Sequence, residues 1–226
     1  MAIDQGQKEL WLQEFHMNGF VVLRDFLPRD LVARMYEELS PLLEAEYRKE
    51  AESDWTRGRA PFRLALDVGP YADLMRGALA DDVYRSNPVI EELVGAILGK
   101  LRKGWTQVEV PWKGSKFMPW HSDQTPKETP DLAGRHEIVR LTFNIPLVEF
   151  TWASGAIELL PGTHWLPRNF WEDKDIRAVN AYPVRLDLRL GDAVLRDGNT
   201  LHRGTPNLTD RPRPMLDQTY KKVTES

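Results

Sequence analysis

The chain has 226 residues, 42% of them hydrophobic and 28% charged, which is ordinary usage for a globular protein, and its net charge of -4 offers no basic surface to nucleic acid. It has no cysteine, which excludes disulfides, thiol nucleophiles and every cysteine-based zinc or iron–sulfur site. No apolar run approaches the ~18 residues of a membrane span, and the charged N-terminus lacks the apolar core of a signal peptide. We therefore expect a cytoplasmic protein, a monomer or homodimer, with no nucleic-acid or membrane partner.

The first hundred residues carry mostly helical patterns. The stretch QKELWLQEFHMNG predicts a helix that ends at Gly19, and FVVLRDF predicts a short strand. A longer helix is expected from LPRDLVARMYEELSPLLEAEYRKE, which has one apolar stripe and a point at Pro41 where it can kink. Residues 51–69 fit no clear pattern, and NPVIEELVGAILG predicts a further helix between an Asn87 cap and Gly99.

From about residue 105 the pattern changes to short β-rich runs punctuated by Pro, Gly and Asn. The runs are WTQVEVPW, FMPWHSD, IVRLTFNIPLV, GAIELLPG, YPVRLDLRLGDAVLRDG and MLDQTYKKV. In the fifth, every second residue from 184 to 190 is apolar, the period of a half-buried strand. Many short strands predict a β-sandwich or barrel with the N-terminal helices packed against it. We expect a single domain over residues 1–226, helix-rich over 1–100 and with its β core over about 105–223, because no linker or repeat divides the chain.

The stretch PWHSDQTP places His121 two residues before Asp123. Residues two apart on a strand, or at its end, point to the same face, so both side chains can converge on one metal ion. The remaining histidines are candidates for a third ligand: His16, His136, His164 and His202. His202 follows a predicted strand, and two histidines with one carboxylate form the facial arrangement of non-haem Fe(II) oxygenases. A chance His-x-Asp pair in a loop, or a polar pair beside a site, is the alternative.

Arg213 lies eleven residues beyond His202 in the phrase HRGTPNLTDRPRPML. An oxygenase that uses 2-oxoglutarate needs a cation for the far carboxylate of this co-substrate, several ångströms from the metal. A guanidinium suits that task because it pairs with a carboxylate through two hydrogen bonds. The offset between His202 and Arg213 therefore favours a 2-oxoglutarate site over a surface arginine.

Four stretches in this order resemble the phytanoyl-CoA dioxygenase family of Fe(II)/2-oxoglutarate oxygenases. They are FHMNGFVVLRDFLPRDLVARMYEEL, WHSDQ, SGAIELLPGTHW and HRGTPNLTDRPR, and together they span about residues 14–220. The resemblance implies a mainly β fold with packed helices, the double-stranded β-helix or cupin-like jelly roll. It also implies that Fe(II), 2-oxoglutarate and O2 are used, and it assigns the metal to His121, Asp123 and His202 and the C5 carboxylate of 2-oxoglutarate to Arg213.

The same resemblance extends to residues around the co-substrate. IVRLTFNIPLV is similar to the strand that lines the co-substrate pocket, which implies that Thr142 holds a 2-oxoglutarate carboxylate and that Asn144 lies close by. WTQVEV is similar to the strand before the His-x-Asp motif, so Gln107 is a co-substrate candidate, with Glu109 next on that face as a substrate candidate. Trp152, in the loop FTWASG, is a further substrate candidate. His164, in a phrase similar to a structural turn, is expected to pack beside the site.

The chemistry that the resemblance implies is oxidation of an unactivated carbon, coupled to conversion of 2-oxoglutarate to succinate and CO2. Relatives that halogenate have a small residue in place of the carboxylate ligand, so Asp123 implies hydroxylation or another oxidation, such as desaturation, epoxidation or ring formation. Two other functions remain open. One is a cupin-like metal isomerase or hydrolase that needs neither Arg213 nor 2-oxoglutarate, and the other is a non-catalytic jelly-roll binding protein. The sequence favours a small metabolite or a biosynthetic intermediate as substrate.

Overall fold

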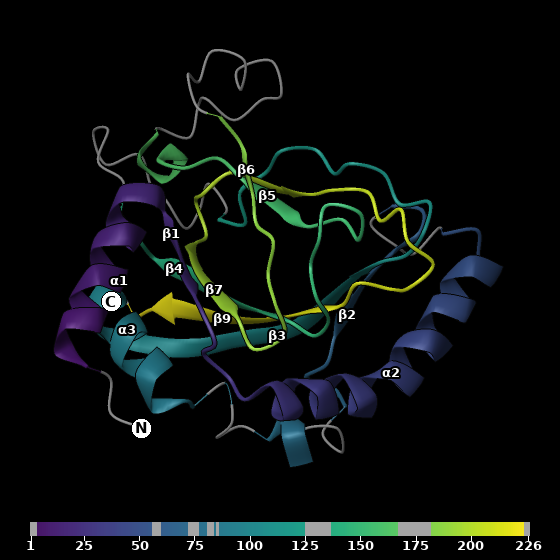
Figure 1. Ribbon diagram of the computed structural model, residues 1–226, viewed down its shortest axis with the longest axis horizontal. Coiled ribbons are helices and arrows are strands. Elements are labelled where there is room, and N and C mark those ends of the chain that lie inside the picture. Colours follow the sequence, from purple (N-terminus) through teal and green to yellow (C-terminus); the bar gives the residue numbers. More distant parts are fainter. Residues whose placement is uncertain are drawn as a thin grey trace.

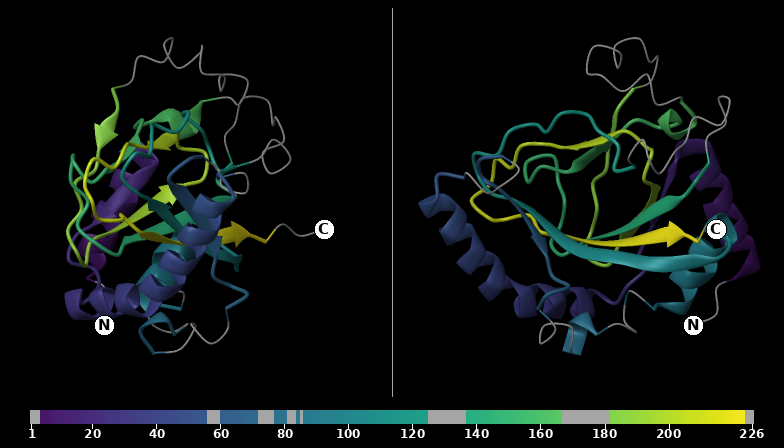
Figure 2. Two further views of the ribbon diagram at one scale, coloured as in Figure 1. Left: turned by 90° about the vertical axis from the view of Figure 1, so that its right-hand side faces the viewer. Right: turned by 180° about the vertical axis from the view of Figure 1, so that it is seen from behind.

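The computed structural model describes residues 4–55, 60–71, 77–80, 84, 86–124, 137–166 and 182–223. In these parts of the chain, helices pack against one face of a large antiparallel sheet, and a small sheet lies over its other face (Figures 1 and 2). His136 lies outside the described residues.

The helices confirm the sequence pattern of the first hundred residues. They are α1 (Gln5–Asn18), α2 (Arg29–Glu52), which contains Pro41, and α3 (Pro88–Leu98), with short 3-10 turns η1 (Gly77–Leu79) and η2 (Thr163–Trp165). Gly19 closes α1 with a φ of 82°, a left-handed conformation that glycine adopts without strain. The Asn87 side chain accepts hydrogen bonds from the first backbone N–H groups of α3, as the sequence predicts.

Six strands make the large sheet, in the order β1-β7-β4-β9-β3-β2, and each pairs antiparallel with its neighbours. Their bounds are β1 Phe20–Leu23, β2 Arg63–Asp67, β3 Leu101–Pro111, β4 Arg140–Pro146, β7 Ala193–Asp197 and β9 Met215–Lys222. The small sheet has the order β6-β5-β8, with β5 Ile157–Leu159, β6 Val184–Arg185 and β8 His202–Gly204. Figure 1 shows the small sheet on one side of the long strands β3 and β9, with α2 on the other.

The central strand β4 shows why one face of the large sheet can carry polar residues. All seven of its residues are buried. Leu141, Phe143 and Ile145 join the apolar core that α1, α2 and α3 cover. The alternate positions, Thr142 among them, face the small sheet, because successive side chains of a strand point to opposite faces. The sheet thus separates an apolar core on the helix side from a polar interior between the two sheets.

Two predicted strands are shorter than expected. In the run from 184 to 190 only β6 is a strand, and Leu188 forms an isolated bridge with Phe150, because the turn over residues 151–156 interrupts the partner segment. The expected alternation of burial holds at Leu186 and Leu188, whereas Val184 is 40% exposed. In FMPWHSD the only strand-like residue is His121, because Pro119 has no backbone N–H for a ladder. The unassigned residues 51–69 contain β2.

Among the described residues, the helices are too short or too polar to span a lipid bilayer.

Candidate active site

Backbone pairing brings the His-x-Asp motif and His202 together. His121 and His202 form an isolated antiparallel bridge, in which the backbone N–H of each donates to the other's carbonyl at 3.1 and 3.0 Å. The backbone N–H of Asp123 then donates to the carbonyl of Gly198 at 2.8 Å, in the turn between β7 and β8. Backbone hydrogen bonds alone thereby hold together two segments that are distant in the sequence.

The three side chains meet in the geometry of a facial metal site. Asp123 Oδ1 lies 3.7 Å from His202 Nε2 and 4.0 Å from His121 Nε2. Donors at about 2.1 Å from one ion and at right angles to each other stand about 3 Å apart, so a modest contraction closes this set around a metal. Within the described residues this is the group of His, Asp and Glu side chains whose ligand atoms could share one ion.

Backbone carbonyls orient both imidazole rings. His121 Nδ1 lies 2.9 Å from the carbonyl oxygen of Pro119, and His202 Nδ1 lies 3.0 Å from that of Thr200. A carbonyl oxygen can only accept, so each Nδ1 carries the proton and each Nε2 keeps its lone pair for a metal. Burial, with help from Arg196 and His121, holds the pKa of His202 well below its usual range, so this ring is neutral at physiological pH.

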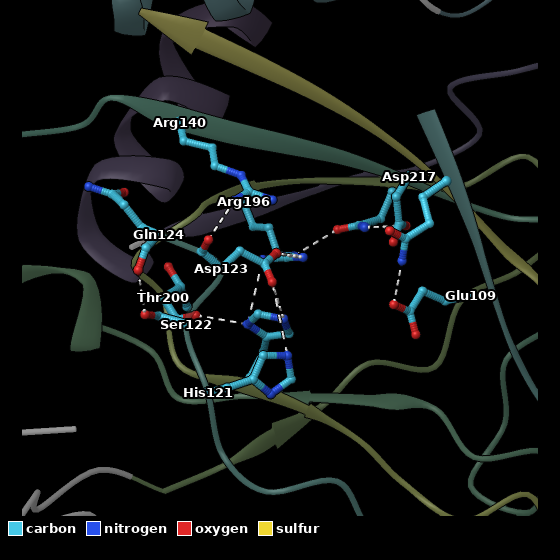
Figure 3. A network of polar contacts seen from close by, with 12 residues as sticks. Glu109, His121, Ser122, Asp123, Gln124, Arg140, Arg196, Thr200 and Asp217 are labelled. Carbon is cyan, nitrogen blue, oxygen red and sulfur yellow. Dashed lines mark hydrogen bonds and ion pairs between the residues drawn. The ribbon is translucent and has the colours of Figure 1, made fainter. Parts of the chain in front are cut away.

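Arg196, on β7, connects the carboxylate to the rest of the site. Its Nη2 donates to Asp123 Oδ2 at 2.5 Å, and its Nε donates to Asn144 Oδ1 at 3.0 Å. The Asn144 Nδ2 in turn donates to Asp217 Oδ1 at 2.6 Å, and Figure 3 shows this network running from Asp123 through Arg196 to Asp217. Burial alone would raise the pKa of Asp123, but the positive charges of Arg196 and Arg140 outweigh it and lower that pKa.

A cavity between the two sheets opens onto these residues. It is lined by His121, Asp123 and His202, together with Arg63, Trp105, Gln107, Glu109, Met118, Arg140, Thr142, Ile157, Arg196, Gly204, Arg213, Met215, Asp217 and Thr219. Its walls therefore come from β2, β3, β4, β7 and β9 on one side and from β5 and β8 on the other. Four of the lining residues are arginines, which is an unusual density of positive charge for a buried space.

Arg213 is buried at 3% exposure and carries unused donors. Its Nε and Nη1 atoms have no hydrogen-bond partner in the described parts of the chain, and its guanidinium stacks 4.2 Å from the ring centroid of Phe150. Burial, followed by the nearby charge of Arg63, lowers the pKa of Arg213 to about 9, so the group is still cationic near neutral pH. Thr142 Oγ1, on the same cavity wall, is also buried without a partner among the described residues.

Two further carboxyl groups face the cavity from β3 and β9. Burial, and then the charge of Glu109, raise the pKa of Asp217 to about 8, so this side chain is largely protonated near neutral pH. Glu109 accepts a hydrogen bond from Gln107 Nε2 at 2.6 Å. Gln107 and Asp217 face one another in the register of β3 and β9, in the same row as Asn144 of β4.

The structure gathers most of the side chains that the sequence singles out. His121, Asp123, His202, Arg213, Thr142, Gln107 and Glu109 all line the cavity, and Asn144 joins it through Asp217 and Arg196. Trp152 is not brought into this group, because it is 64% exposed on its loop and lies over Arg185. His164 is fully buried in η2, where its Nε2 lies 3.1 Å from the carbonyl oxygen of His16.

Four charged residues of the cavity wall were not singled out from the sequence: Arg63, Arg140, Arg196 and Asp217. Asp217 had a usable signal, since it is a carboxylate inside the predicted strand run MLDQTYKKV, shortly after Arg213. Arg196 also had one, because it is a charged residue inside the predicted strand run DAVLRDG. Arg63 had none, because its strand follows a segment without periodicity.

Comparisons with known proteins bear on the family and the fold of the chain. The model of the phytanoyl-CoA dioxygenase (PhyH) family matches residues 15–215. The dioxygenase FrzG of Cladobotryum sp is 26% identical over 219 residues, covering 89% of this chain and 70% of the relative.

Solved structures share the fold. The epimerase SnoN, determined in complex with Fe3+, alpha ketoglutarate and nogalamycin RO, superposes with a TM-score of 0.69 at 21% identity, over 98% of this chain and 86% of its own. AviO1 from Streptomyces viridochromogenes Tue57 superposes with a TM-score of 0.70 at 18% identity, over 100% of this chain and 98% of its own. The expected jelly-roll-like double-stranded β-helix is thereby confirmed. With a family match over most of its length, the chain belongs to the phytanoyl-CoA dioxygenase family.

Proposed function

We propose that the protein is a non-haem Fe(II)- and 2-oxoglutarate-dependent dioxygenase that hydroxylates or otherwise oxidises an unactivated carbon of a small metabolite or natural-product intermediate. The observation that carries this proposal is the combination of a metal-ligand triad and a buried arginine with unused donors in one cavity. A metal isomerase or hydrolase would explain the triad but not the arginine, and a non-catalytic binding protein would require neither.

The donor set fits a ferrous ion. Two neutral imidazole nitrogens and one carboxylate oxygen are the ligands of the facial iron site, and they leave the opposite coordination positions to other molecules. We assign the metal to His121 Nε2, His202 Nε2 and Asp123 Oδ1, because Asp123 Oδ2 is already held by Arg196.

The cavity also fits the distal carboxylate of 2-oxoglutarate. A buried cation without a counter-ion is unfavourable, and a carboxylate that accepts from its donors removes this penalty. We assign the C5 carboxylate to Arg213, with Thr142 Oγ1 as a further donor, since both have unused hydrogen-bonding capacity on the cavity wall. Gln107 and Asn144 lie in the adjoining row across β3, β9 and β4.

When bound, iron and 2-oxoglutarate together supply oxidation by O2 coupled to formation of succinate and CO2. The protein positions and shields this chemistry. Arg196 holds Asp123 in one orientation, and the Thr200 carbonyl keeps the Nδ1 proton on His202. Trp105, 40% exposed with the Arg140 guanidinium 4.1 Å from its ring centroid, forms part of the wall that the substrate meets. Glu109 is a candidate substrate contact from the same strand.

The test measures succinate formed from 2-oxoglutarate by the protein reconstituted with Fe(II) under air. We expect succinate release that requires iron and 2-oxoglutarate, that His202→Ala abolishes, and that in Arg213→Met requires a much higher 2-oxoglutarate concentration. Arg185→Gln, which alters an arginine paired with Glu158 outside the cavity lining, is the control and should behave like the wild type. Turnover of a substrate without any need for 2-oxoglutarate would support the metal isomerase or hydrolase instead.

A further inference from the structure

Arg63 approaches the cavity from β2, on one side of β3, and Arg213 from the segment just before β9, on the other side of β3. Arg63 of β2 pairs with Pro111 of β3, and the backbone N–H of Arg213 donates to the carbonyl of the same proline at 3.2 Å. The two side chains therefore start from one row of the sheet. Both are 3% exposed, and both line the cavity that contains the metal-ligand triad.

The Arg63 guanidinium is held by backbone carbonyls on one side. Its Nη2 donates to the carbonyl oxygens of Lys116 and Thr205 at 2.7 and 2.8 Å, and its Nε donates to that of Lys116 at 3.2 Å. These acceptors are neutral, so they fix the direction of the guanidinium without neutralising it. Within the described residues the Nη1 atom has no such acceptor, and this is the atom that lies beside Gly204.

Gly204 makes room for this guanidinium. A Cβ atom at this position would lie 2.6 Å from Arg63 Nη1 and 3.2 Å from its Cζ. The φ of Gly204 is not in the left-handed region, so the backbone does not require glycine here. Gly204 lies on β8, two residues after His202, and both residues line the cavity. The absence of a side chain at Gly204 leaves room there for the Arg63 guanidinium.

The charges at this end of the cavity do not balance. After burial, the positive charge of Arg63 is the next largest cause of the lowered pKa of Arg213, because the two cations repel each other. In the described parts of the chain neither forms an ion pair with a carboxylate: Arg63 donates to backbone carbonyls, and Arg213 stacks on Phe150. Glu109 favours the charged form of both, and Asp217 favours that of Arg213, but the raised pKa of Asp217 leaves it largely protonated near neutral pH. Two guanidinium groups therefore face Glu109 and a mostly neutral Asp217. A further carboxylate would neutralise the surplus, and it offers two oxygens to two guanidinium groups.

We propose that Arg63 is a second cation for the distal carboxylate of 2-oxoglutarate, which it binds together with Arg213. This inference rests on the proposed function. Removing Arg63 is expected to weaken 2-oxoglutarate binding by about tenfold or more, the usual effect of losing a hydrogen bond to a charged group. The reference ligand is 2-oxovalerate, which has the same chain and 2-oxo acid end but a methyl group in place of the distal carboxylate.

The experiment titrates each ligand into the full-length protein loaded with Mn(II), which prevents turnover, and measures the dissociation constant by calorimetry. We expect Arg63→Gln to weaken 2-oxoglutarate by about tenfold or more and to leave 2-oxovalerate within about twofold. Gly204→Ala, which displaces the guanidinium but keeps its charge, should also weaken 2-oxoglutarate selectively. Arg185→Gln is the matched control and should change neither ligand.

A double variant tests whether the two arginines share one carboxylate. If they do, Arg63→Gln and Arg213→Gln combined should weaken 2-oxoglutarate by less than the product of the separate effects. Equal loss of both ligands, or an unchanged 2-oxoglutarate affinity in Arg63→Gln and Gly204→Ala, would overturn the role of Arg63 and leave it a structural clamp for Lys116 and Thr205. A wild-type protein that binds no 2-oxoglutarate would instead overturn the proposed function itself.

Discussion

Arg196 contacts three members of the site through one guanidinium group. It donates to Asp123 Oδ2 and Asn144 Oδ1, and its Nη1 lies 3.5 Å from His202 Nδ1. His202 Nδ1 lies closer, at 3.0 Å, to the Thr200 carbonyl oxygen, which can only accept a hydrogen bond, so Nδ1 carries the proton. The role of Arg196 is therefore to fix the carboxylate, which leaves Oδ1 as the atom that faces both Nε2 donors.

Replacement of Arg196 by methionine should weaken metal binding without removing a ligand. The Asp123 carboxylate would lose its fixed orientation, and loss of such an outer partner typically lowers metal affinity by about 10- to 100-fold. Titration with Mn(II), followed by electron paramagnetic resonance, measures the change. Arg185→Gln serves as the control, and an Arg196→Met protein with wild-type Mn(II) affinity would show that Asp123 needs no such support.

Asp217 should make the folded state less stable as pH rises. Its folded pKa of about 8 lies above the value of about 3.9 for an unfolded aspartate, so between these values the folded state binds a proton that the unfolded chain releases. The free energy of unfolding therefore falls with increasing pH through that window. Besides burial, Glu109 and Asp123 favour the protonated form of Asp217, whereas Arg196 and Asn144 favour its ionised form.

Asp217→Asn removes this group while keeping the shape of the side chain. Urea unfolding at about pH 5 and about pH 8 should show a smaller loss of stability in the variant than in the wild type. Because the other titrating groups contribute equally to the pH dependence of both proteins, their contributions cancel in the comparison. The same loss in both proteins would mean that Asp217 ionises in the folded state as readily as in the unfolded chain.

At the scale of single elements, capping chemistry made α3 predictable. Asn87 accepts from the backbone N–H groups of Val89 and Ile90 at 3.0 and 3.4 Å. Asn87→Ala should lower the free energy of unfolding by about 1 kcal/mol, whereas Asn87→Asp should change it little, because aspartate caps equally well. Urea denaturation measures both, and an alanine variant as stable as the wild type would show that the cap contributes nothing.

The strands were less predictable than the helices because their lengths depend on their partners. The turn over residues 151–156 ends the pairing of the run that begins at Val184, and no local pattern in that run indicates this. The strand β2 was missed because its residues 64–66 are all apolar, so the expected alternation of apolar and polar residues is absent. Arg63 could not be placed in the cavity for the same reason.

At the scale of the whole molecule, the large sheet collects site residues from segments that are distant in the sequence. The proposed metal ligands and Arg213 could be named from motif spacing and family resemblance, since these residues lie in short recognisable phrases. Arg196 and Asp217 join them only through the register of β7, β4 and β9. Trp152, a substrate candidate from the sequence, is not among the residues that line the cavity.

The proposed site predicts that metal and 2-oxoglutarate bind next to each other, and the visible spectrum reports this directly. Chelation of Fe(II) by the 2-oxo acid end of 2-oxoglutarate produces a charge-transfer band that neither component gives alone. The measurement is anaerobic addition of 2-oxoglutarate to the Fe(II)-loaded protein, with His202→Ala and Arg213→Met beside the wild type. We expect the band in the wild type, no band in His202→Ala, and in Arg213→Met a band that develops only at much higher 2-oxoglutarate concentration. A wild-type protein that binds Fe(II) but develops no band, or an Arg213→Met protein with an unchanged 2-oxoglutarate requirement, would contradict the assignment of this cavity.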